Sequence, residues 1–152
     1  MTSSTEPVAL STEPFECLRL IVGHMIPASE KHGVPGADDP KIMADMAATI
    51  GRDFDALSAI LDIVNAAAGG HLGDLQAAAQ RALLADLRSR DAGAFGVIEA
   101  VASRAYYRDD RVLKSIGVEQ RAPFPEGYVV EEGDWSLLDP VRRRGAIYRD
   151  AG

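Results

Sequence analysis

The sequence predicts an all-α protein, a compact bundle of about five to six helices followed by an extended C-terminal arm that contains aromatic residues and proline. Three observations support this fold class. Apolar residues recur at helical spacing as far as Gly117, and proline, glycine and capping residues separate the stripes. Strand signals are few, with Val129-Val130 the only β-branched pair of the arm. We therefore expect a disordered leader at 1–10, a helical domain at 11–117 and an extended partner-binding arm at 118–152.

The first two helices have clear boundary residues. Ser11 or Thr12 can cap the first helix, and Pro27 is expected to stop it. Asp39-Pro40 is a typical start for the second, because aspartate caps a helix and proline suits its first turn. The apolar stripes of these helices are Phe15, Leu18, Ile21, Val22 and Met25, then Ile42, Met43, Met46 and Ile50.

Four further helices follow the same logic. The third should begin at about Asp53 and end at Gly69-Gly70, where glycine can take the left-handed conformation that closes a helix. Asp74 is expected to cap the fourth, the fifth should run into Tyr106-Tyr107, and the sixth should span Asp110 to Ile116. The fourth is predicted to line one side with Leu75, Ala79, Leu83, Leu84 and Leu87, and the fifth with Phe95, Ile98, Val101, Ala102 and Ala105.

The charge of the chain limits its partners. A formal net charge of -7 and a pI near 4.9 argue against general binding to nucleic acid or anionic membrane, because both need a basic face. The local cluster of Arg142-Arg143-Arg144 with Arg149 is interpreted as a solvated or partner-facing helix end. No apolar run approaches the roughly 20 residues that span a bilayer, and no signal peptide is evident, so we expect a soluble protein.

Candidate catalytic chemistry is sparse. The single Cys17 lies in a helical stripe and is expected to pack as a small hydrophobic residue. Three histidines, His24, His32 and His71, lack the repeated carboxylate spacing of a metal site. Asp38-Asp39 is explained by helix capping, and the glycines of 69–73 by a turn between helices. We therefore predict no catalytic, cofactor-binding or metal-binding residue in this chain.

The arm holds aromatic residues without core periodicity. Four of the nine aromatic side chains follow Gly117, in a segment interrupted by three prolines. Such a segment either folds back on its own helices or lies on another protein, and aromatic residues suit a partner surface. The residues predicted to bind a partner are Tyr106, Tyr107, Phe124, Pro125, Tyr128, Trp135 and Tyr148.

Two stretches of the chain carry a family resemblance. The first runs from Arg19 to Ala28 and continues in Gly36-Ala37-Asp38-Asp39. It resembles the opening of the gluconate 2-dehydrogenase subunit 3 family. In that family a first helix ends at an Ile-Pro-Ala step, and a Gly-Ala-Asp element starts the next helix. The second is similar to the family's closing pattern of a tyrosine pair, a short helix and a Pro-x-Gly-Tyr turn. It comprises Tyr106-Tyr107, Asp110, Val112, Gly117 and Pro125-Glu126-Gly127-Tyr128. Together the stretches frame residues 15 to 128.

The resemblance implies a small, cofactor-free helical subunit of an oxidoreductase complex. Its partner would be a large FAD-dependent dehydrogenase of the glucose-methanol-choline (GMC) oxidoreductase type that acts on an alcohol or sugar, and the small subunit would assist its folding, maturation or stability in a chaperone-like way. Family members often carry a twin-arginine export signal. Because residues 1–20 contain no twin arginine, we expect a cytoplasmic heteromer, with periplasmic export alongside the partner as the alternative.

Two other interpretations are open at the level of sequence. The chain could be a small helical enzyme that uses Tyr106, Tyr107 and either His24 or His71 in a pocket under the arm. It could also be a stand-alone homodimer that exchanges the arm between copies. An activity assay and a mass measurement on the isolated chain distinguish these from the subunit interpretation.

Overall fold

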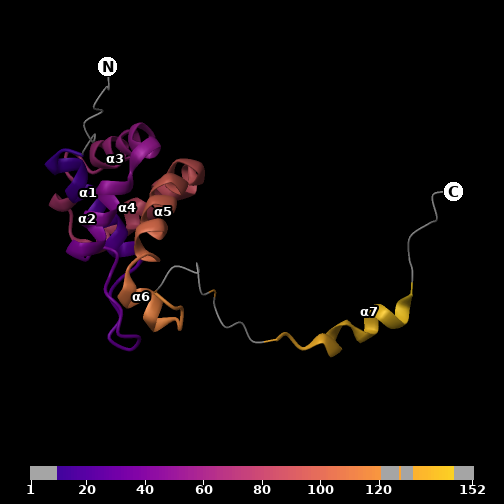
Figure 1. The fold of residues 1–152 in the computed structure, drawn as a ribbon. Coiled ribbons are helices and arrows are strands. Elements are labelled where there is room, and N and C mark those ends of the chain that lie inside the picture. The colour runs from indigo at the N-terminus through magenta and orange to yellow at the C-terminus, as the bar shows by residue number, and fades with distance from the viewer. Residues whose placement is uncertain (1–9, 121–126, 128–131, 146–152) are drawn as a thin grey trace, which may run out of the picture. The chain divides into compact units, whose positions relative to one another are not determined.

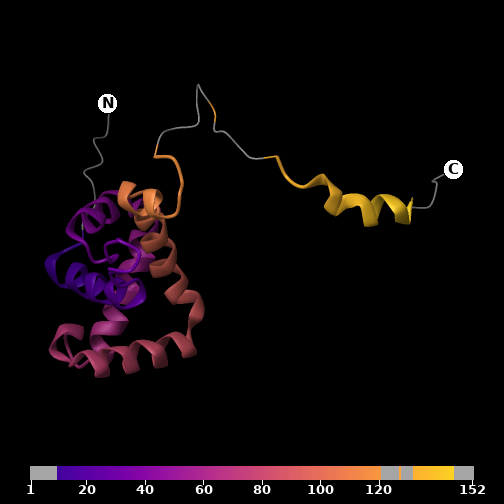
Figure 2. The same cartoon turned by 90° about the horizontal axis from the view of Figure 1, so that it is seen from below.

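The structure is a computed structural model that describes residues 10–120, 127 and 132–145 of the 152-residue chain. The chain divides into two units, residues 1–120 and 121–152. Seven α-helices lie in the described residues, six in the first unit and one in the second, and no β-strand occurs among them (Figures 1 and 2). The predicted all-α fold class is therefore confirmed.

Helices α1 (Thr12–Met25) and α2 (Pro40–Thr49) begin and end close to the predicted residues. The Asp39 carboxylate accepts hydrogen bonds from the backbone amides of Lys41 at 2.9 Å and Ile42 at 3.4 Å, which confirms it as the cap of α2. Ser11 occupies the capping position of α1 without a side-chain hydrogen bond to the helix. The sequence therefore located both helix starts, although only one uses its capping side chain.

Helix α3 (Phe54–Ala67) follows a 3₁₀ turn at Gly51–Asp53 and is closed by Gly69, whose φ of 86° is the predicted left-handed conformation. The cap predicted for the next helix at Asp74 is wrong. Asp74 ends a 3₁₀ turn at Leu72–Asp74, and helix α4 (Ala77–Arg90) begins after Gln76.

A buried glutamine explains this shift. The Gln80 side-chain amide donates hydrogen bonds to the carbonyls of Leu72 at 3.2 Å and Leu75 at 2.9 Å. The Leu72 carbonyl also accepts from the Leu75 amide at 3.2 Å, which closes the 3₁₀ turn, so the side chain of Gln80 holds this turn at the start of α4. Ala79, which was expected in the apolar stripe of α4, is exposed, and Gln80 and Leu84 are the buried residues of the helix.

Helices α5 (Ala92–Tyr106) and α6 (Asp110–Ser115) complete the first unit. Asp91 caps α5 through the Ala94 amide at 2.9 Å, and Asp109 caps α6 through the Arg111 amide at 2.9 Å. Gly117, with a φ of 75°, follows α6 as predicted. The fifth helix ends at Tyr106, so the tyrosine pair lies at its C-terminal end.

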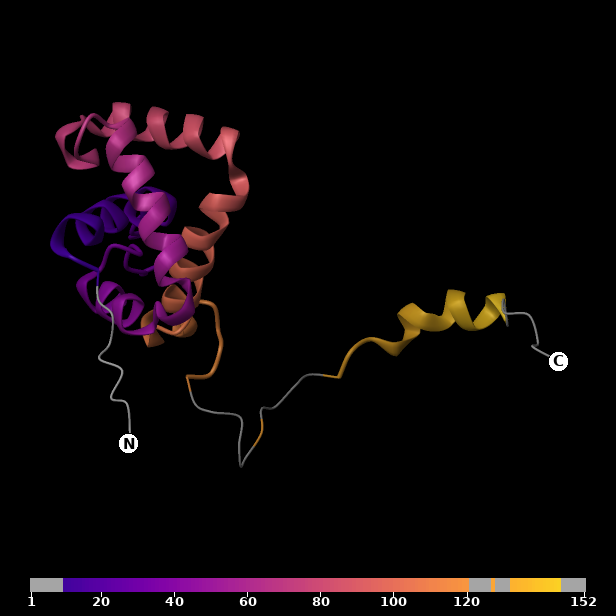
Figure 3. The ribbon, with the colours of Figure 1, turned by 90° about the horizontal axis from the view of Figure 1, so that it is seen from above.

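The core lies among α1, α2, α3 and α5. The apolar positions predicted for α1, α2 and α5 are buried in one cluster, except for Phe15, which is half-buried, and Met25, which is exposed. Cys17 belongs to this cluster, as predicted, and burial raises the pKa of its thiol to about 12. Figure 3 shows α4 lying across one end of the bundle. Consequently α4 contributes little to the core.

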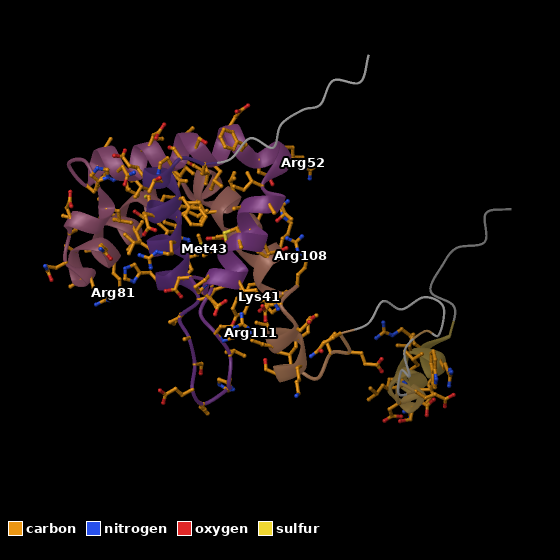
Figure 4. The ribbon with its side chains drawn as sticks, turned by 60° about the vertical axis from the view of Figure 1, so that its left-hand side comes forward. Lys41, Met43, Arg52, Arg81, Arg108 and Arg111 are labelled. Atoms are coloured by element: carbon orange, nitrogen blue, oxygen red, sulfur yellow. The ribbon has the colours of Figure 1, made fainter. Side chains whose placement is uncertain are left out.

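An ion-pair cluster fastens α6 to the start of α2. The Arg111 guanidinium bonds Asp39 at 2.7 and 3.1 Å and Asp109 at 2.8 and 3.0 Å, while the Lys41 ammonium lies 3.5 Å from Asp109 (Figure 4). The Asp109 side chain is only 3% exposed. Hydrogen bonding to Arg111 lowers the pKa of Asp109 to about 2 and also lowers the pKa of Asp39. These residues are called the Arg111 cluster below.

In the second unit, part of the arm is helical. A 3₁₀ helix at Trp135–Leu138 leads into α7 (Asp139–Arg144), where an extended segment was expected. The Asp134 carboxylate accepts hydrogen bonds from the Ser136 amide at 3.0 Å and from its hydroxyl at 2.6 Å, so it starts the first turn. Pro140 stands in the first turn of α7, a position where proline favours a helix.

We predict that Arg111→Ala lowers the free energy of unfolding by about 2 kcal/mol, because it leaves the buried Asp109 carboxylate without its main partner. Urea denaturation measures this change. Arg90→Ala is the matched control, since it removes an exposed pair with Asp86 four residues earlier and should cost no more than about 0.5 kcal/mol. Equal effects of the two substitutions would show that the Arg111 cluster adds nothing beyond a surface ion pair.

We also predict an acid-dependent loss of stability from Asp109. Its folded-state pKa of about 2 lies below its ordinary value of 3.8, so its contribution is complete above that value and is lost as the pH falls toward 2. Urea midpoints of wild type and Asp109→Asn should therefore converge as the pH falls through this window. A constant difference between the two proteins from pH 5 to pH 2 would contradict the assignment.

Candidate functional site

The loop between α1 and α2 lies against Tyr106, at the end of α5. The Ala37 amide donates to the Ile26 carbonyl at 2.9 Å, and the Tyr106 hydroxyl donates to the Pro35 carbonyl at 3.1 Å. The loop between α1 and α2 is thus held at both of its ends and against the end of α5. Gly36 is buried in this loop, and a Cβ there would meet the Asp38 carboxylate and the Ala28 amide.

Only one residue of the tyrosine pair is available to a partner. Tyr106 is 5% exposed and packs in the core, so its role is internal rather than on a partner surface. Tyr107 is 54% exposed, and its ring meets Tyr106 edge to face with ring centroids 5.5 Å apart. The sequence could not predict which of the two tyrosines is buried, because adjacent residues at a helix end differ only in the direction their side chains face.

Trp135 is the one predicted arm anchor that lies in the described residues. The other four, Phe124, Pro125, Tyr128 and Tyr148, lie outside them. Trp135 is 64% exposed, and Leu137, Leu138 and Val141 are exposed with it. Spacings of three or four residues link Trp135 to Leu138, and both leucines to Val141, along these turns, and we call the four exposed side chains the arm face.

The charged side chains of the same turns bond to one another. Asp139 pairs with Arg142 at 3.3 Å, and its carbonyl accepts from Arg143 Nε at 3.3 Å. Arg142, Arg143 and Arg144 form the last turn of α7, as predicted for a helix end, while Arg149 lies outside the described residues. The described part of the second unit has no buried residue of its own.

A cleft of about 540 Å³ lies among α1, α4 and α5 of the first unit. Its apolar lining includes Ile21, Met25, Leu84 and Phe95. Three charged side chains, Arg81, Arg88 and Glu99, also line it, and Arg88 and Glu99 form an ion pair at 2.7 Å. We call this the α4 cleft.

His24 forms part of the cleft wall, and Gln80 orients it. The Gln80 nitrogen donates both hydrogens to the Leu72 and Leu75 carbonyls, so its oxygen must be the atom that lies 2.7 Å from His24 Nε2. An amide oxygen only accepts, and His24 Nε2 therefore carries a hydrogen. The ring is thus fixed in one orientation, and Nδ1 is left without a hydrogen bond among the described residues.

The clefts that the two candidate histidines line include neither Tyr106 nor Tyr107. His24 lines the α4 cleft, whereas His71 lies 3.5 Å from Glu13 in a second cleft beside the start of α1. The Tyr106 hydroxyl is engaged by the Pro35 carbonyl. Among residues 10–120, 127 and 132–145, no group of three or more His, Cys, Asp or Glu side chains is placed to hold a metal ion.

The candidate site is thus a pair of surfaces, the arm face and the α4 cleft, on an all-α protein. Comparisons of the chain with protein-family models, with curated proteins and with solved structures find no match. None of the helices in the described residues is long and apolar enough to span a membrane. The surfaces themselves, together with the sequence resemblance, are therefore the basis for a functional proposal.

The loop between α1 and α2 yields a stability prediction. Gly36→Ala should lower the free energy of unfolding by about 1 to 3 kcal/mol, because the new methyl group displaces the backbone of Ala28. Gly96→Ala is the control in the interior of α5, where no atom lies within 4 Å of the added carbon, and helix propensity should raise stability by up to about 1 kcal/mol. Thermal unfolding of both variants measures the change in stability, which should be negative for Gly36→Ala and positive for Gly96→Ala. If Gly36→Ala stabilised the protein, the loop around Gly36 would not be tightly packed.

Proposed function

We propose that this chain is a non-catalytic small subunit that binds and stabilises a larger protein. The observation that carries the proposal is the arm face, where Trp135 and three aliphatic side chains are exposed on helical turns that have no core of their own. Apolar surface of this kind gains free energy when it is covered, at roughly 25 cal/mol for each Å² removed from water. Protein binding is the function that uses such a surface.

The partner we propose is a large FAD-dependent dehydrogenase of the glucose-methanol-choline oxidoreductase type that acts on an alcohol or sugar. The resemblance to the gluconate 2-dehydrogenase subunit 3 family supports this choice, since its residues frame most of the helical unit. FAD and the reaction chemistry would belong to the partner, and this chain would assist assembly and stability. Tyr107, exposed at the end of α5, is a further candidate contact.

Local structure favours the arm face as a binding element. Asp134 and Pro140 start the two helical turns, so residues 135–144 have helical structure in the absence of a partner. Less conformational entropy is then lost on association. The exposed indole of Trp135 offers the large apolar area that is typical of interface hot spots.

An arm-exchanged homodimer is the second candidate function, and the same exposed face favours it. The two are separated by co-expression with the flavoprotein encoded by the neighbouring reading frame. The subunit proposal expects one stable heteromer with the absorbance of bound flavin. A chain that elutes only as its own dimer, with no flavoprotein attached, would support exchange and contradict the subunit role.

We predict that Trp135→Ala weakens the heteromer about thirtyfold, equivalent to roughly 2 kcal/mol, because truncating a buried interface tryptophan removes a hot spot. Biolayer interferometry on the purified subunits measures the dissociation constant. Ile63→Ala, which truncates an exposed apolar side chain on α3, is the control and should change it less than twofold. Helical circular dichroism of both variants should match wild type.

One result of this experiment would contradict the role of the arm face. If Trp135→Ala lowers the helical signal of the isolated chain and leaves the dissociation constant of the complex unchanged, the indole packs within this chain. The arm face would then not be the partner surface.

A further inference from the structure

We propose that the α4 cleft is a second docking site for the flavoprotein partner, and that it takes an apolar segment of the partner that carries a carboxylate. This inference rests on the proposed function, because it assigns a second contact to the same complex. It concerns residues of α1, α4 and α5 alone and makes no use of the arm.

The first argument is the shape and lining of the cleft. Its volume of about 540 Å³ lies within the range of roughly 300 to 1,000 Å³ that is usual for ligand pockets, and Ile21, Leu84 and Phe95 contribute apolar surface to it. Met25 adds an adaptable thioether side chain that is itself exposed. A cleft of this size accommodates several side chains of a bound segment.

The second argument is the incomplete packing of α4. Of its 14 residues only Gln80 and Leu84 are buried, whereas α5 buries six of its 15. The helix is attached at its start by the hydrogen bonds of Gln80, and its residues Leu84 and Ala85 line the cleft. A segment seated in the cleft would complete the apolar contacts that this helix lacks within its own chain.

The third argument is charge. Arg81 forms no ion pair among the described residues, while Arg88 is paired with Glu99, so the cleft has one uncompensated positive charge in a chain of net charge -7. A guanidinium beside apolar surface binds a carboxylate strongly, through paired hydrogen bonds. The charge of the cleft therefore selects an acidic apolar segment over a basic one.

The fourth argument is preorganisation. Gln80 fixes the ring of His24 and leaves Nδ1 free of any hydrogen bond among the described residues, so the cleft wall holds an oriented polar group as well as a charge. Few polar groups in a mostly apolar lining are the usual source of orientation and specificity in a binding site.

The experiment reverses the charge of one arginine inside the cleft and one outside it. Arg81 and Arg52 are exposed arginines on the same helical unit, and Figure 4 shows them far apart on it. Arg81→Glu should raise the dissociation constant of the flavoprotein complex at least tenfold, and the effect should shrink as salt is added. Arg52→Glu should change it less than twofold. Equal effects of the two variants overturn the docking site.

A second measurement uses 8-anilinonaphthalene-1-sulfonate, an apolar anion, as a fluorescent probe of the full chain. Arg81→Glu should weaken binding of the probe at least fivefold relative to Arg52→Glu, and saturating flavoprotein should release the probe from the wild-type cleft. If binding of the probe depends on Arg81 but the probe stays bound when the flavoprotein is saturating, the cleft is a site for small anions, and the proposal of a partner segment is overturned.

Failure of this inference is distinguishable from failure of the proposed function. If Trp135→Ala weakens the complex and Arg81→Glu does not, the subunit role stands and the cleft is not part of the interface. If the wild-type chain captures no flavoprotein, both proposals fall. If the isolated chain is a dimer that Arg81→Glu dissociates, the occupant is a second copy, and the proposal of a partner segment is overturned.

Discussion

The hydrogen-bonded pairing of Arg111 with Asp109 and Asp39 is the interaction on which the arrangement of the first unit depends. Asp39 caps α2 and Asp109 caps α6, so one guanidinium joins the starting turns of two helices that lie far apart in sequence. The Asp109 carboxylate is buried, and removing its partner would leave an uncompensated charge. The Tyr106 hydroxyl bond to Pro35 adds a second tie nearby, and together they hold the loop between α1 and α2.

The hydrogen bonds of Arg111 and Tyr106 join elements within the first unit, whereas the two surfaces proposed for binding have side chains that are exposed to solvent. The arm face combines exposed apolar side chains with local helix starts, and it has no packing partner in the described part of its unit. The α4 cleft is built differently, since its lining combines apolar side chains with Arg81, a guanidinium that has no ion pair among the described residues. An apolar anchor supplies affinity through burial, whereas a charged cleft adds selectivity, so the two surfaces are complementary in the proposed complex.

Much of the helical unit could be predicted from local sequence. Asp39-Pro40, Gly69 and Gly117 act within a few residues of their own position, and each stands where the pattern expected it. Gln80 could not be anticipated in the same way. A polar residue in an apolar stripe is usually taken as exposed, and its burial is explained only by two carbonyls and a histidine that the fold brings to it.

The sequence by itself determined the all-α class, the order of the helices and the positions of most of their ends, because capping, glycine conformation and apolar periodicity are local properties. Tertiary structure alone decided which of Tyr106 and Tyr107 faces solvent, which aspartates share Arg111, and that His24 and Arg81 line one cleft. Those outcomes depend on contacts between helices, and no spacing along the chain encodes which side chains will meet there.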